Sequence, residues 1–168
     1  MPRALIAFVH LVEKLNYGVG RFAMYLLFVL MAVLMWSSIS KAMGAPSLWT
    51  LEMAQFVMVA YYVLGGPYAW QLGTHVRMDL FYARQSVGSR ALWDAFTVLA
   101  VIFYLGVMLY GAIDATAYSF EYGERSPTAW RPYLWPVKVT MVIGFLLMLL
   151  QALASLIRDI AHLRGVSI

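Results

Sequence analysis

Four long blocks without a formal charge divide this sequence and constrain its fold more than any other feature. They cover residues 22–40, 53–72, 95–113 and 139–157. Each is about 19–20 residues long, the length an α-helix needs to cross roughly 30 Å of hydrocarbon. Only 12% of the 168 residues are charged, which leaves too little polar surface to cover four such blocks in water. The sequence therefore predicts an all-α integral membrane protein with four helices.

The blocks and their flanks predict a single membrane domain over residues 1–168. We expect the spans at about 22–43, 50–72, 92–114 and 136–157. An arm at about residues 1–20 precedes them and predicts a short N-terminal interfacial helix, or else a simple extension of the first span. A signal peptide cleaved near Ala42-Met43-Gly44-Ala45 is the weaker alternative, because the first block is longer than a typical signal sequence core.

The distribution of Lys and Arg predicts the orientation of the chain. Eight of the twelve basic residues lie in the N-terminal arm, the middle loop and the C-terminus, and four lie in the first and third loops. The positive-inside rule places the side with eight in the cytoplasm. Both termini are then cytoplasmic.

Asp, Glu, Lys, Arg and His are absent from the four blocks, which argues against a transport pathway built by this chain alone. Such groups cost roughly 2.5–3.5 kcal/mol at mid-membrane and persist there for function. The chain has no cysteine, and His10, His75 and His162 all lie outside the blocks, so we expect no cofactor and no metal site. The basic residues form no patch, so nucleic acid is not an expected partner, whereas membrane lipids are. No catalytic constellation can be assembled, and we do not expect an enzyme.

Two outer segments are candidate partner surfaces. The third loop is stiffened by three prolines and carries Trp130 and Arg131, residue types that dominate protein-binding hot spots. Its aromatic rings also suit anchoring to lipid headgroups, and the two roles are compatible. Glu52 opens the second span beside Trp49, where it either complements the helix dipole or contacts a partner subunit.

The stretch Gly73-Thr74-His75-Val76-Arg77-Met78-Asp79-Leu80 resembles a motif of the small membrane subunit of TRAP transporters (tripartite ATP-independent periplasmic transporters). That family shows Gly-x-His-hydrophobic-Arg-hydrophobic-Asp just after its second span. The Trp49-x-x-Glu52 pair is similar to the family's Trp-x-Glu-Glu region, although Leu51 stands where a second acid is common. The prolines of the third loop also fit, and the resemblance covers about residues 20–160.

The resemblance implies a non-catalytic small permease subunit in a bacterial inner membrane. A periplasmic substrate-binding protein would deliver an organic acid, and a large polytopic membrane subunit would carry it inward by symport down a sodium or proton gradient. This chain would be a scaffold for the large subunit. His75, Arg77 and Asp79 would then form a cytoplasmic polar corner, either as a helix cap with a topology-setting arginine or as a contact between subunits.

Two other functions stay open at this point. The chain is alternatively a structural four-span subunit of another membrane complex, such as a tricarboxylate importer or a respiratory assembly. It is alternatively a self-sufficient, homo-oligomeric small transporter, which would be expected to carry a membrane-embedded acid.

Overall fold

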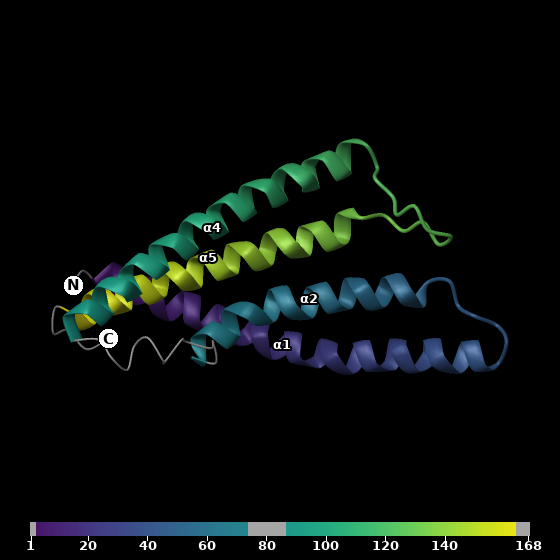
Figure 1. Ribbon diagram of the computed structural model, residues 1–168, viewed down its shortest axis with the longest axis horizontal. Helices are drawn as coiled ribbons and strands as arrows, with labels where there is room; N and C mark the ends of the chain where they lie inside the picture. Colours follow the sequence, from purple (N-terminus) through teal and green to yellow (C-terminus); the bar gives the residue numbers. More distant parts are fainter. Residues whose placement is uncertain (1–2, 74–86, 164–168) are drawn as a thin grey trace.

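The protein is a bundle of long helices. The computed structural model describes the backbone of residues 3–73 and 87–163 and the side chains of residues 5–73 and 97–161. Over these residues the chain forms four helices and no strand, as the uncharged blocks predict. The helices are α1 (Arg3–Ala42), α2 (Thr50–Gln71), α4 (Val87–Glu121) and α5 (Trp135–Leu163) (Figure 1).

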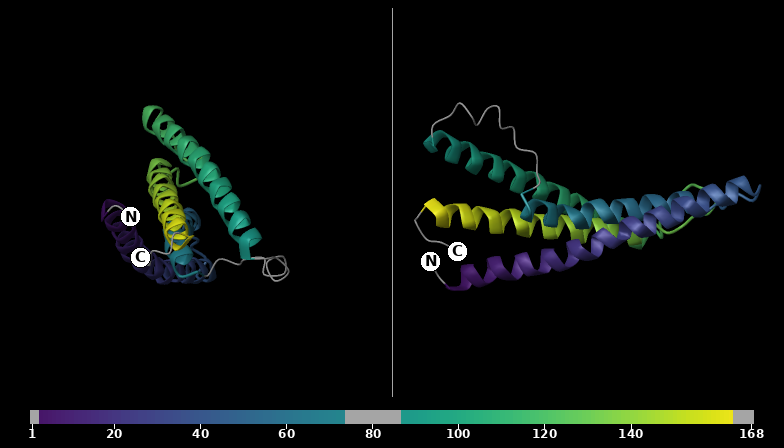
Figure 2. Two further views of the ribbon diagram at one scale, coloured as in Figure 1. Left: turned by 90° about the vertical axis from the view of Figure 1, so that its left-hand side faces the viewer. Right: turned by 90° about the horizontal axis from the view of Figure 1, so that it is seen from below.

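The helices pair as two hairpins, α1 with α2 and α4 with α5. Helix α5 is the centre of the bundle, since it packs against α1 and α2 as well as α4 (Figures 1 and 2). The α1–α2 and α4–α5 connections lie at one end of the bundle, which we call the loop end. The opposite end, where α1 and α4 begin and α2 and α5 end, is the terminal end.

Three of these helices are long and apolar enough to cross a membrane, over Leu5–Ala42, Thr97–Glu121 and Trp135–Ala161. Only 6% of the most apolar window of α4 is buried within the protein, and 28% of that of α5. Apolar surface on this scale needs a cover other than water. Helix α2 is not among the three because Glu52, Gln55 and several tyrosines make it less apolar, so its span stays a prediction.

The expected N-terminal arm is the first half of α1 and not a separate element. Helix α1 is continuous for 40 residues, about 60 Å at 1.5 Å per residue. Val9 and Val12 on this half are buried and pack with Ala154 of α5. Buried residues of α5 recur at spacings of three, four and seven, which places them on one face of the helix. They are Gly144, Leu147, Gln151, Ala154 and Ala161.

Polar side chains tie α1 to its neighbours near the terminal end. Asn16 is only 1% exposed, and its Nδ2 donates a hydrogen bond of 2.6 Å to Oε1 of Gln151. One turn from Asn16 on α1, Glu13 pairs with Arg158 of α5, and Gln71 Nε2 of α2 donates to the Glu13 carbonyl at 3.3 Å. Buried polar groups are unfavourable unless they are paired, so these contacts specify how the three helices align.

Two glycines allow the helices to approach closely. A Cβ atom at Gly144 of α5 would clash with the Val63 side chain and lie 2.9 Å from the Val63 backbone oxygen of α2. A Cβ atom at Gly20 of α1 would clash with the Tyr68 side chain. Small residues at such crossings are typical of membrane helix packing.

Candidate functional site

The α4–α5 connection at the loop end has a defined start and finish. Helix α4 ends at Glu121 and is followed by Gly123, whose φ of 57° suits glycine; the Glu124 amide donates to the Ser119 carbonyl at 3.2 Å. Helix α5 begins at Trp135, whose ring stacks on Phe120 of α4 with centroids 5.4 Å apart. The connection is therefore anchored to both helices.

Between these anchors the chain doubles back on itself. The Ser126 amide donates to the Pro132 carbonyl at 2.9 Å, and the Leu134 amide donates to the Glu124 carbonyl at 3.1 Å. The Arg125 guanidinium lies over the Tyr133 ring, 4.1 Å from its centroid. Contacts across the two arms hold the tip, residues 127–131, away from the helices.

Trp130 and Arg131 occupy this tip. Both are exposed, and the Trp130 side chain is 39% exposed, a large apolar area for one residue. Arg131 has a φ of 50°, a left-handed conformation that costs a residue with a side chain about 1–3 kcal/mol. The pairing of residues 124–126 with 132–134 maintains this conformation, so the tip is a rigid aromatic and cationic surface.

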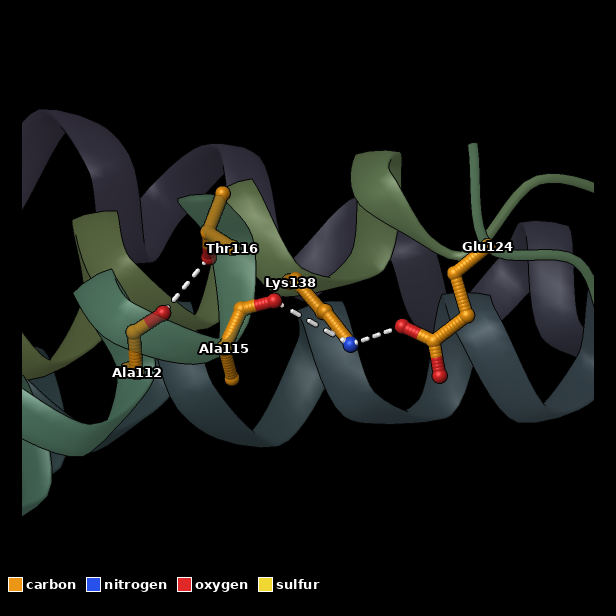
Figure 3. Close-up of polar contacts among 5 residues, drawn as sticks. All are labelled: Ala112, Ala115, Thr116, Glu124 and Lys138. Atoms are coloured by element: carbon orange, nitrogen blue, oxygen red, sulfur yellow. Dashed lines mark hydrogen bonds and ion pairs between the residues drawn. The ribbon is translucent and has the colours of Figure 1, made fainter. Parts of the chain in front are cut away.

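Lys138 joins both helices to the loop (Figure 3). Its Nζ donates to the Ala115 carbonyl of α4 at 3.2 Å and pairs with the carboxylate of Glu124. Near it, the Thr116 hydroxyl donates to the Ala112 carbonyl at 2.6 Å. The hydrogen bond from Lys138 lowers the pKa of Glu124 below its ordinary value of 4.5, and the Lys138 charge adds to this effect.

Acid is expected to weaken this contact. Because the pKa of Glu124 is lowered by folding, its stabilising contribution is complete above pH 4.5 and is lost as the pH falls through the folded value. We expect Glu124→Gln to melt at a lower temperature than the parent chain at pH 7, with a difference that shrinks below pH 4.5. Melting curves in detergent at both pH values test this, and a difference that stays constant with pH would contradict it.

The α1–α2 connection at the same end is held by hydroxyl groups. Thr50 Oγ1 donates to Ser37 Oγ, Ser47 Oγ donates to Thr50 Oγ1, and Ser40 Oγ lies within hydrogen-bonding distance of Ser47 Oγ, each at 3.1 Å. These four side chains join the last turns of α1 to the first turn of α2. These hydrogen bonds fix the part of the connection that is next to Trp49 and Glu52.

Trp49 and Glu52 do not share a surface. Trp49 is 37% exposed, whereas Glu52 is 5% exposed and its Oε2 is buried without a hydrogen-bond partner. Of these two residues, Trp49 is the one that offers a surface at this connection. His75, Arg77 and Asp79 lie outside the described residues.

Several of the contacts above are not apparent from the sequence. In the sequence, Lys138 and Arg158 contribute only to the charge distribution, and nothing marks Asn16 as a contact residue. Their partners Glu124, Glu13 and Gln151 are distant along the chain, and Asn16 is separated from Gln151 by 135 positions. The sequence signal that could have found them is the helical spacing of polar residues, three positions along α1 and seven along α5.

The described part of the chain contains no candidate metal centre. No group of three or more His, Cys, Asp or Glu side chains there is placed to hold a metal ion. What the loop end presents instead is a pair of fixed connections with exposed Trp49, Trp130 and Arg131. Such an arrangement suits protein recognition.

These features define a multi-pass, all-α membrane protein with a rigid aromatic surface at one end. Comparison with protein families gives a match over residues 30–162 to the DctQ component of tripartite ATP-independent periplasmic transporters. The match covers well over half of the chain, and the chain belongs to this family of small TRAP membrane components. No curated protein sequence matches the chain at a significant level.

Proposed function

We propose that this chain is the non-catalytic scaffold subunit of a TRAP importer in a bacterial inner membrane. Its partners are the large polytopic permease subunit and a periplasmic substrate-binding protein. The binding protein delivers an organic acid, and the large subunit imports it by symport with sodium ions or protons. The chain itself carries no substrate.

The observation that supports scaffolding most is the uncovered apolar surface of α4. This helix packs against α5, and 94% of its most apolar window is not buried within the protein. Its exposed residues include large rings suited to helix packing, such as Phe103, Tyr104 and Tyr110. Part of such a surface can pack against the large subunit, and the rest can contact lipid.

The distribution of charges along the spans agrees with this role. In α1, residues 22–40 contain no Asp, Glu, Lys, Arg or His, and neither do residues 139–157 of α5. A subunit that carried an organic anion and a coupling ion would need polar groups at that depth. In this proposal the large subunit contributes those groups.

We further propose that α2 also crosses the membrane, which makes four spans in all, and that the terminal end faces the cytoplasm. The excess of Lys and Arg at that end supports this orientation. The loop end, with Trp49, Trp130 and Arg131, then faces the periplasm, where the binding protein docks. His75, Arg77 and Asp79 are assigned to a cytoplasmic contact with the large subunit.

Reconstitution tests the scaffold role. Proteoliposomes that contain the large subunit with this chain should take up the organic acid in the presence of the binding protein and an ion gradient. Those with either membrane subunit alone should not. Gradient-driven uptake by this chain alone would contradict the proposal, and so would full uptake by the large subunit without it.

A further inference from the structure

A groove of about 330 Å³ lies between α1 and α2 toward the terminal end. Its walls include Gly20 and Met24 of α1 and Tyr61, Gly65 and Leu72 of α2. Gly20 lets the two helices come together, whereas a Cβ atom at Gly65 would meet nothing within 4 Å. The absence of a side chain at Gly65 therefore leaves the groove open.

The length of the groove along α2 corresponds to the thickness of one leaflet of a bilayer. Leu72 and Arg21 stand at the ends of the uncharged blocks of α2 and α1, so this end of the groove lies at headgroup level. From Leu72 to Tyr61 the helix rises by about 16 Å. That distance is close to half of the roughly 30 Å hydrocarbon core. An acyl chain that enters from the headgroup region would reach mid-membrane within it.

Basic side chains flank the headgroup end of the groove. Lys14 and Arg21 are exposed and lie two helical turns apart on one side of α1, with Tyr17 between them. Arg21 Nη1 donates to the Tyr17 hydroxyl at 3.4 Å, and the Tyr17 ring contacts Tyr68 of the groove wall, with centroids 5.7 Å apart. The nearby carboxylate of Glu13 is paired with Arg158 and does not neutralise these two cations.

We propose that the groove binds an anionic phospholipid, with an acyl chain along Gly65 and the phosphate between Lys14 and Arg21. Basic pockets between membrane helices at the cytoplasmic surface are suited to anionic headgroups. The site goes beyond the scaffold function, because its ligand is a lipid and its binding needs neither of the other two subunits. Only the choice of leaflet depends on the proposed orientation.

Lipid titration followed by native mass spectrometry tests the site. The purified full-length chain is titrated in detergent with phosphatidylglycerol or phosphatidylcholine of identical acyl chains. We expect tighter binding of one phosphatidylglycerol, weakened about fivefold by Arg21→Gln and again by Lys14→Gln. Lys41→Gln, at the other end of α1, is the matched control and should change nothing.

Filling the groove tests the acyl-chain site separately. Gly65→Leu should weaken the binding of both lipids at least about tenfold. Gly111→Leu on α4, where a Cβ atom also meets nothing within 4 Å, should leave it unchanged. Circular dichroism establishes that each variant is folded, and the charge variants test the site independently of any groove mutation.

Three results would overturn the lipid site. They are equal affinity for the two lipids, no effect of Arg21→Gln, and unchanged lipid binding by folded Gly65→Leu. If that variant instead binds lipid normally but no longer co-purifies with the large subunit, the groove holds a helix of that subunit. Failure of the scaffold function would appear in the uptake assay and would leave these lipid affinities unaffected.

Discussion

Replacing Gly144 with alanine is expected to destabilise the bundle by about 1–3 kcal/mol. The added methyl group would meet the Val63 side chain and the Val63 backbone oxygen at 2.9 Å. A side chain can rotate away, but a helix backbone can yield only if α5 moves off α2. Because α5 also packs against α1 and α4, this displacement would disturb the whole bundle. Unfolding in detergent micelles, followed by circular dichroism, measures the effect.

Gly111→Ala is the matched control for this prediction. A Cβ atom at Gly111 of α4 meets nothing within 4 Å, so alanine adds no clash. Its higher helix propensity should leave stability unchanged or raise it by up to about 1 kcal/mol. Equal free energies of unfolding for Gly144→Ala and Gly111→Ala would contradict the close contact between α5 and α2.

The second large effect is expected at the tip of the α4–α5 connection. Replacing both Trp130 and Arg131 with alanine should weaken docking of the binding protein on the assembled membrane complex at least about thirtyfold. Loss of a single hot-spot residue of these types costs about 2 kcal/mol or more, which alone corresponds to about thirtyfold. The contacts of Arg125, Ser126 and Tyr133 hold the tip in place without either side chain. The affinity of the cognate binding protein for the complex in nanodiscs is the measurement.

A conservative pair of changes separates recognition from folding at this tip. Trp130→Phe with Arg131→Lys keeps an aromatic ring and a positive charge, so we expect it to retain most of the affinity. Arg131→Gly removes the side chain and also the conformational strain of a left-handed backbone. It should therefore weaken docking without unfolding the connection. Unchanged affinity in the double alanine variant would show that the binding protein docks elsewhere.

The uncharged blocks predicted the helices well, and the family followed from short motifs. Residues at about 50–72, expected as the second span, are helical as α2 (Thr50–Gln71), and the family model confirms the resemblance to the TRAP small subunit. The other helices extend beyond their blocks; α4, for example, covers Val87–Glu121 around the block 95–113. Charges mark where hydrocarbon would end, whereas a helix continues as long as its backbone hydrogen bonds do.

The tertiary contacts could not be predicted from the sequence. The Asn16–Gln151 hydrogen bond depends on where α1 crosses α5, which no local pattern encodes. Glu52 shows the same limit, because its position in the first turn of α2 suggests exposure to solvent or a partner. In the structure its side chain is 5% exposed. Burial there depends on how α2 is oriented about its own axis, which the neighbouring helices decide.

The scaffold role is tested most directly by isolating the tagged chain from its native membrane in a gentle detergent and identifying what accompanies it by mass spectrometry. We expect one large polytopic membrane protein, recovered in constant proportion to this chain. Recovery with subunits of a respiratory assembly or another importer would contradict the assignment of the partner. Recovery of the chain alone as a homo-oligomer would contradict the scaffold function itself.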